Sequence, residues 1–280
     1  MDNASAFALV ALDLDGTALQ PDGTISERLK RAVGEALERG VRVILATGRM
    51  IHSAEPFWRE LGLPAGPLVA YQGAVVAEMP EGRIVAKVTL PEEGARRAVE
   101  WAVDRGLLTQ VYVGTELWVS REDPRVRNYI EKNHIPAWVR GPAELTDWPE
   151  SPIKVLLQDD EAVLDRVRGE LETLVAPYAI RVFKSQPDYL ELVSEQVGKA
   201  VGLQAAAQSL NVPQSRVLAV GDAENDIDML QWAGWGVAMG QAPEVVKRAA
   251  DAVTQPVDQD GAAKAIERWV LEMSSDQTEP

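Results

Sequence analysis

Two aspartates one residue apart, Asp13 and Asp15, are the side chains of this chain that most directly suggest chemistry. They follow an apolar run, 7–12, which predicts a buried strand of a parallel sheet. Open α/β sheets bind ligands at the carboxyl ends of their strands, so we expect both carboxylates there. One could act as a nucleophile, the other could transfer a proton, and both could help to hold a hard cation such as Mg²⁺.

A second pair of acids, Asp222 and Asp226, lies in the segment GDAEND directly after a predicted strand at 217–220. Carboxylate and amide oxygens are the ligands that hard cations prefer, so this segment is a candidate metal site. Acids at the start of a helix also complement the helix dipole. At this point both interpretations remain open.

Thr47, Gly48 and Arg49 follow a predicted strand at 41–46 and precede a short helix. The hydroxyl of Thr47 and the amides of the next two residues could donate to an anion at a helix N-terminus. Alternatively, Thr47 caps the helix and Gly48 is a turn residue.

Lys199 opens a predicted helix at 199–210. A lysine at this end opposes the helix dipole, so local helix stability does not favour it. A compact cation suits a phosphate oxygen or a nucleophilic carboxylate. The alternative is an ordinary surface lysine.

The elements that must position these residues alternate between strand and helix near both ends of the chain, which predicts a parallel-sheet core. In the middle, strands neighbour strands, which predicts a largely antiparallel sheet with helices on one face. We therefore expect an α/β core of residues 1–87 and 188–280, interrupted by an inserted α+β domain at 88–187. We expect 75–78 and 83–88 to form a hairpin. The predicted strands are 7–12, 41–46, 67–71, 75–78, 83–88, 109–113, 117–120, 153–158, 180–184, 189–193, 217–220, 236–239 and 252–254. The predicted helices are 26–39, 92–105, 124–133, 161–175, 199–210 and 261–271, and we expect 274–280 to be a frayed tail.

The composition narrows the possible partners. The formal net charge is −15, which repels nucleic acid and means that an anionic substrate needs local cations or a metal. The chain has no cysteine, which excludes thiol chemistry, and no stretch long enough to span a membrane. We expect a soluble cytoplasmic protein, and the sequence leaves its oligomeric state open. The two histidines, His52 and His134, have no partner cluster, so we expect packing or surface roles.

The order of these segments resembles the haloacid dehalogenase-like superfamily of aspartyl phosphotransferases. The matching segments are DLDGT (13–17), ATGR (46–49), Lys199 and GDAENDIDML (221–230), with the insertion between the second and third. The TGR triplet and the Asn225-Asp226 pair look most like the Cof-type phosphatases of sugar phosphates and cofactor phosphates. The resemblance implies a Rossmann-like core in which the inserted domain is a large α/β cap.

The resemblance also implies roles. Asp13 would attack phosphorus and Asp15 would protonate the leaving oxygen and then activate water. Mg²⁺ would be held by Asp13, the Asp15 carbonyl and Asp222, with support from Asp226. The phosphate would be bound by Thr47, Gly48 and Asn225, while Lys199 would neutralise charge and Arg49 could bind an anionic group of the substrate.

Two positions depart from the family pattern. Relatives usually have Asn-Gly-Ala where this chain has Gln72-Gly73-Ala74, and Lys-Gly where it has Lys199-Ala200. Neither change removes a reacting group. We expect a Mg²⁺-dependent phosphatase of a small phosphorylated metabolite. The alternatives are a sugar-phosphate phosphomutase, which would return the phosphoryl group to its substrate, and a non-catalytic metabolite-binding protein.

Overall fold

The computed structural model describes residues 6–133, 135 and 137–272. His134 and the expected tail at 274–280 lie outside the described residues. The chain divides into two compact units, the first formed by 1–86 with 198–280 and the second by 87–197. Each is described by itself.

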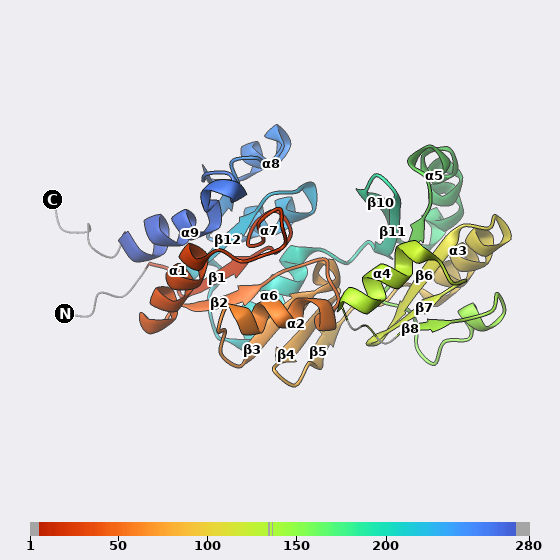
Figure 1. Cartoon of the computed structure of the whole chain (residues 1–280), viewed down its shortest axis with the longest axis horizontal. Coiled ribbons are helices and arrows are strands. Elements are labelled where there is room, and N and C mark those ends of the chain that lie inside the picture. Colours follow the sequence, from red (N-terminus) through yellow and green to blue (C-terminus); the bar gives the residue numbers. More distant parts are fainter. Residues whose placement is uncertain (1–5, 134, 136, 273–280) are drawn as a thin grey trace. The chain divides into compact units, whose positions relative to one another are not determined.

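A five-stranded parallel sheet in the order β14-β13-β12-β1-β2 forms the centre of the first unit (Figure 1). Its strands are β1 (Leu9–Leu12), β2 (Arg42–Leu45), β12 (Val217–Gly221), β13 (Trp235–Ala238) and β14 (Ala252–Val253). Leu9 lies opposite both Val217 and Arg42, so β1 has a parallel neighbour on each side. The predicted parallel core is confirmed, although the first strand begins at Leu9 rather than at Phe7. The strands that precede the predicted catalytic segments are therefore neighbours.

Helices cover this sheet. They are α1 (Glu27–Glu38), α2 (Ile51–Glu60), α6 (Lys199–Ser209), α7 (Ile227–Trp232), α8 (Glu244–Ala249) and α9 (Gly261–Ile266). Leu9 and Ala11 of β1 pack in one apolar cluster with Leu203 of α6 and Met229 of α7. Because successive strand residues point to opposite faces, the equally buried Val10 faces the other side of the sheet. Buried side chains on both faces explain the continuous apolar run of β1.

Local signals set the helix ends. The side chain of Ser26 accepts a hydrogen bond from the amide of Leu29 and caps α1, as predicted. Gly40, with φ +78°, ends the same segment in the left-handed conformation that glycine adopts without strain. The predicted helix at 261–271 is shorter, since α9 ends at Ile266 and a π-helical segment, Glu267–Glu272, follows.

A small three-stranded sheet lies beside the main sheet in the order β3-β4-β5. Its strands are β3 (Gly66–Ala70), β4 (Val75–Met79) and β5 (Arg83–Lys87). β3 pairs antiparallel with β4, and a single bridge between Ala46 and Val69 links it to the end of β2. The predicted hairpin is confirmed by the adjacent strands β4 and β5.

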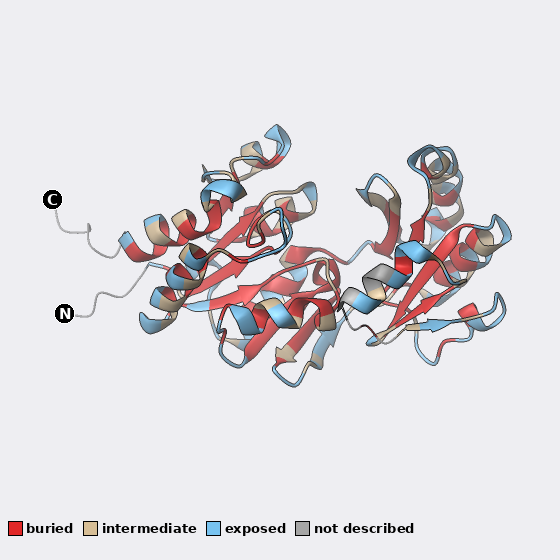
Figure 2. Ribbon diagram, in the orientation of Figure 1, coloured by how far each residue is buried: buried red, intermediate tan, exposed pale blue. Residues whose placement is uncertain are grey.

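The second unit contains a six-stranded sheet in the order β10-β11-β9-β6-β7-β8. Its strands are β6 (Leu108–Val113), β7 (Glu116–Val119), β8 (Ala137–Val139), β9 (Lys154–Gln158), β10 (Ile180–Gln186) and β11 (Tyr189–Ser194), and its helices are α3 (Glu92–Asp104), α4 (Pro124–Asn133) and α5 (Glu161–Val175). The pairs are antiparallel except β7 with β8. Figure 2 shows that the central strands are buried.

One boundary differs from the sequence analysis. The sequence pattern predicts that residues 188–197 belong to the core, but they lie in the second unit. The reason is that β11 pairs with both β9 and β10, so its backbone hydrogen bonds are satisfied inside the inserted sheet. Among the described residues, no helix combines the length and apolar character that crossing a bilayer requires.

Candidate active site

Lys199 is the centre of a buried charge cluster at the carboxyl edge of the main sheet. It begins α6 and is 1% exposed. Its Nζ donates to Asp13 Oδ1 and to Asp226 Oδ1, both at 2.5 Å. The surface-lysine interpretation is therefore wrong. A buried ammonium that bridges two carboxylates holds the ends of β1 and β12 in one fixed arrangement.

Asp13 follows the last residue of β1 and is 4% exposed. Its amide donates to the carbonyl of Val220 on the neighbouring strand at 3.0 Å. Lys199 occupies Oδ1, whereas Oδ2 accepts no hydrogen bond from the described residues. That oxygen is available to attack an electrophile or to bind a cation.

Asp226 is fully buried, and both of its oxygens have donors. Oδ1 accepts from Lys199, and Oδ2 accepts from the amides of Asp222 and Ala223 at 2.9 and 3.0 Å. Its carboxylate therefore ties the lysine to the turn that carries Asp222. This arrangement favours support of a metal site over direct ligation by Asp226.

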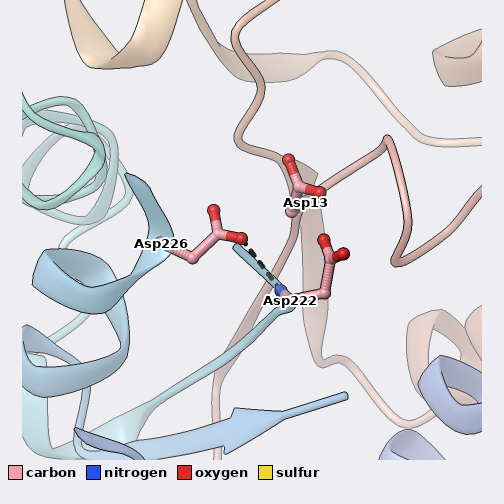
Figure 3. Close-up of side chains that lie close together, drawn as sticks. All are labelled: Asp13, Asp222 and Asp226. Carbon is pink, nitrogen blue, oxygen red and sulfur yellow. Dashed lines mark hydrogen bonds between the residues drawn. The ribbon is translucent and has the colours of Figure 1, made fainter. Parts of the chain in front are cut away.

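Asp13, Asp222 and Asp226 each offer one carboxylate oxygen, and these three oxygens lie within 4.8 Å of one another (Figure 3). If all four groups of the cluster are charged, three carboxylates face a single ammonium, so the cluster has an excess of negative charge. A divalent cation would neutralise that excess, and hard oxygen ligands are what Mg²⁺ prefers. The residues present thus fit the metal that the sequence resemblance implies.

Burial and crowding shift the ionisation of these groups. Burial raises the pKa of Asp13 well above its usual value; the charges of Asp226 and Asp222 add to this, while Lys199 opposes it. Burial raises the pKa of Asp222 to about 6, with a further contribution from Asp226. Burial alone would lower the pKa of Lys199, but Asp13 and Asp226 outweigh it and the net shift is upward. The lysine thus stays charged, while the raised pKa values of Asp13 and Asp222 make these two carboxyl groups easier to protonate than usual.

Asp15 lies apart from this cluster, with a side chain that is 60% exposed. Arg49 binds it through two hydrogen bonds, Nε to Oδ2 at 2.8 Å and Nη2 to Oδ1 at 2.6 Å. The guanidinium also lies 5.0 Å from the centre of the Phe57 ring. Arg49, expected to bind an anionic group of a substrate, is thus paired with the predicted acid/base residue.

Thr47 is buried in the loop after β2. Its Oγ1 accepts from the amide of Arg49 at 3.1 Å, so that amide is not available to an anion. The helix-cap alternative is wrong, because the N-cap position of α2 is Met50, three residues further on. The hydroxyl hydrogen of Thr47 is still available for donation.

Asn225 and Gln72 are joined across the site. Asn225 lies between the two acids of the GDAEND segment, and its Nδ2 donates to Gln72 Oε1 at 2.7 Å. Gln72 is the position noted as a departure from the family pattern. The structure therefore connects that departure to a predicted phosphate-binding residue.

Three residues around Asp222 were not predicted. Thr17 Oγ1 donates to Asp222 Oδ1 at 3.3 Å, and Gln241 Nε2 donates to the Gly16 carbonyl at 2.6 Å. Gly16 has φ +83°, and a Cβ there would overlap the Asp222 carboxylate. A search for polar residues after every core strand would have found Gln241, which follows β13 closely.

Comparison with known proteins agrees with this geometry. A family model described as haloacid dehalogenase-like hydrolase matches residues 10–266. The chain is 30% identical over 266 residues to a Bacillus subtilis protein named 5-amino-6-(5-phospho-D-ribitylamino)uracil phosphatase YcsE, covering 94% of this chain and 96% of that protein. A second Bacillus subtilis protein with the same activity in its name, YitU, is 28% identical over 271 residues. This match covers 93% of this chain and 97% of that protein.

The fold is also similar to that of a solved structure. A haloacid dehalogenase-like hydrolase from Bacteroides thetaiotaomicron superposes with a TM-score of 0.84 at 33% identity. The match covers 94% of this chain and 99% of the other. The similarity therefore extends over both units.

Proposed function

The chain belongs to the haloacid dehalogenase-like hydrolase family and is a phosphoric monoester hydrolase, and on this premise we propose a Mg²⁺-dependent phosphatase that works through a phosphoaspartate on Asp13. The substrate is a small phosphorylated metabolite. The observation that carries the proposal is the buried Lys199, whose Nζ bridges Asp13 and Asp226 beside Asp222. A nucleophile, a fixed cation and a site for a divalent metal are what phosphoryl transfer requires, because its catalysis consists mainly of positioning and charge neutralisation.

The first step transfers the phosphoryl group to the enzyme. Oδ2 of Asp13, which has no protein donor among the described residues, attacks phosphorus while the bond from phosphorus to the ester oxygen breaks. Asp15 gives that oxygen its proton, so that an alcohol leaves. Lys199 stays hydrogen-bonded to Oδ1 and offsets the charge of Asp13.

The second step returns the enzyme to its starting state. Asp15, now ionised, accepts a proton from water, and the resulting nucleophile attacks phosphorus. The bond between phosphorus and Asp13 breaks, which releases orthophosphate. Both oxygens of Asp15 accept from Arg49, so Asp15 must release at least one of these hydrogen bonds in order to transfer a proton.

Metal and phosphate would be held by different sets of residues. We assign Mg²⁺ to Asp13, Asp222 and the carbonyl of Asp15, with Asp226 holding the turn in place, and this ion would stabilise negative charge on the phosphoryl oxygens. We assign the phosphoryl oxygens to the Thr47 hydroxyl, the Gly48 amide and the Asn225 amide. These three groups are uncharged hydrogen-bond donors, so they can bind a dianionic phosphoryl group without repelling it.

Similarity supports a proposal for the substrate class. Two relatives are named for a phosphate ester of a ribitylaminouracil, so sugar-like and cofactor-like phosphates are the first compounds to test. We further propose that residues 87–197 act as the substrate-selecting cap. If that unit were replaced by a short linker and substrate preference did not change, this role would be wrong.

A direct experiment is detection of the intermediate. We expect the chain with Mg²⁺ to release orthophosphate from a panel of sugar phosphates, nucleotides, flavin mononucleotide and pyridoxal phosphate. Acid quenching during turnover should trap one phosphoryl group on the Asp13 peptide, and Asp13→Asn should abolish both signals while keeping its melting temperature. Trapping on another residue would refute the assignment. An isomerised sugar phosphate without free phosphate would instead show a phosphomutase.

A further inference from the structure

Gln72 lies in an unusual backbone segment next to the site. Tyr71, Gln72 and Gly73 all have positive φ angles, 52°, 59° and 89°. This region is uncommon for residues other than glycine, and such strain persists where surrounding contacts fix it. Here the amide of Gln72 donates to the carbonyl of Thr47, and the amide of Tyr71 donates to that of Arg49, both at 3.0 Å. The segment is therefore bound to the predicted phosphate loop.

The side chain of Gln72 lies over that loop. A Cβ added at Gly48 would overlap the Gln72 side-chain amide nitrogen, so the absence of a side chain at Gly48 makes room for this amide. On its other side, Gln72 Oε1 accepts from Asn225 at 2.7 Å. Gln72 thus lies between two of the three residues assigned to the phosphate.

Only one of the two polar atoms of the Gln72 side-chain amide has a hydrogen-bond partner. The residue is 7% exposed, yet among the described residues its Nε2 has no hydrogen-bond acceptor, while its Oε1 is occupied. Nε2 is not among the buried side-chain atoms that lack a partner, so its two N–H donors reach solvent and can bind an acceptor that a ligand brings. An anion beside the Gly48 amide and Asn225 would provide one.

We propose that Gln72 is a substrate-binding residue whose Nε2 donates to a phosphoryl oxygen, while its Oε1 holds Asn225 in position for the same group. The inference rests on the proposed function, since it assigns a contact to the phosphoryl group at that site. It also explains the departure from the family pattern. The longer side chain spans from the strained segment to Asn225 and still presents a donor.

Two substitutions separate the donor from the acceptor. Gln72→Glu keeps the shape and the acceptor for Asn225 but replaces the donor by a negative charge. Gln72→Leu removes both. If Nε2 contacts the phosphoryl group, each should lower kcat/KM for p-nitrophenyl phosphate about 10- to 100-fold and weaken inhibition by orthophosphate in parallel, because a hydrogen bond to a charged group is lost. A Gln72→Glu enzyme with wild-type kcat/KM would overturn the donor role.

A double substitution tests whether the contact is direct. If Gln72 acts only through Asn225, Gln72→Leu should have no effect in an Asn225→Ala background. We expect a further loss of at least several-fold in that background, and its absence would overturn the proposal. Gln208, an exposed glutamine of α6, provides the matched control, since Gln208→Leu should leave kcat/KM unchanged.

Folding and function remain distinguishable in this test. Gln72→Asn shortens the amide, but asparagine tolerates positive φ better than glutamine, so its melting temperature should not fall while its kcat/KM does. Unchanged kcat/KM in this variant would contradict the assigned reach of the side chain. If the wild-type chain hydrolysed no phosphomonoester, the proposed function would fail. Calorimetric binding of orthophosphate, compared between wild type and Gln72→Glu, would still decide the role of Gln72.

Discussion

Lys199 donates a 2.5 Å hydrogen bond to Asp13 although 186 residues of sequence separate them. The pair joins the start of α6 to the end of β1. Lys199 donates a second hydrogen bond to Asp226. A buried ion pair of this kind gives little net stability, because desolvating the charges offsets their attraction. The ion pair instead positions the proposed nucleophile, Asp13, beside the charged Lys199.

Removal of the lysine should therefore harm both stability and activity. Lys199→Ala leaves buried carboxylates without their counter-charge, which costs roughly 3–5 kcal/mol when one partner of a buried pair is removed. The loss should be smaller at pH 5 than at pH 7, since the pKa of Asp13 is raised and protonation relieves the repulsion. Urea unfolding of the metal-free protein at both pH values measures this. Lys30→Ala, which breaks two solvent-accessible ion pairs, with Glu27 and with Glu60, should have little effect and serves as the control.

Asp15 and Arg49 should act as one unit. Asp15→Asn should lower kcat by about 10²–10⁴ for an alkyl phosphate, the usual contribution of general acid–base catalysis. The loss should be smaller for p-nitrophenyl phosphate, whose leaving group needs no proton. If Arg49 works by holding Asp15, Arg49→Ala should show the same dependence on leaving group and add nothing to Asp15→Asn. Additive losses would mean that Arg49 has a separate role, such as binding the substrate.

Gly16 and Gly23 provide a matched pair for the metal site. Both have φ close to +80°, but a Cβ at Gly16 would overlap Asp222, whereas a Cβ at Gly23 meets nothing within 4 Å. Each change to alanine strains the backbone to a similar extent. Only Gly16→Ala should weaken Mg²⁺ binding measured by calorimetry, because it displaces a proposed ligand. Equal Mg²⁺ affinities in the two variants would show that Asp222 does not hold the metal.

Asp222 should give metal binding a pH dependence. Its folded-state pKa of about 6 lies above the usual value of about 3.9. Between these values the folded protein binds more protons than the unfolded chain. The stabilising contribution of this group is therefore greatest at low pH and falls as pH rises through 6. Mg²⁺ needs the ionised form, so the gain in melting temperature on adding Mg²⁺ should grow from pH 5 to pH 7.5. A constant gain would argue against Asp222 as a ligand.

The parallel core can be predicted from local sequence alone, because continuous apolar strands such as Leu9–Leu12 indicate burial on both faces of a sheet. The acids that follow these strands can likewise be assigned to the sheet edge where ligands bind. The sequence also predicted the antiparallel inserted sheet. It did not place residues 188–197, since strand pairing rather than local pattern assigns β11 to the second unit.

Which side chains contact one another becomes visible in the folded protein. Nothing near Lys199 in the sequence shows that it is buried between two carboxylates, and nothing near Arg49 shows its pairing with Asp15. Gln72 was visible only as an exception to a family pattern, until its contact with Asn225 gave that exception a role. Sequence patterns indicate whether a residue is buried and in which helix or strand it lies. Hydrogen-bond partners far apart in the chain depend on how those elements pack.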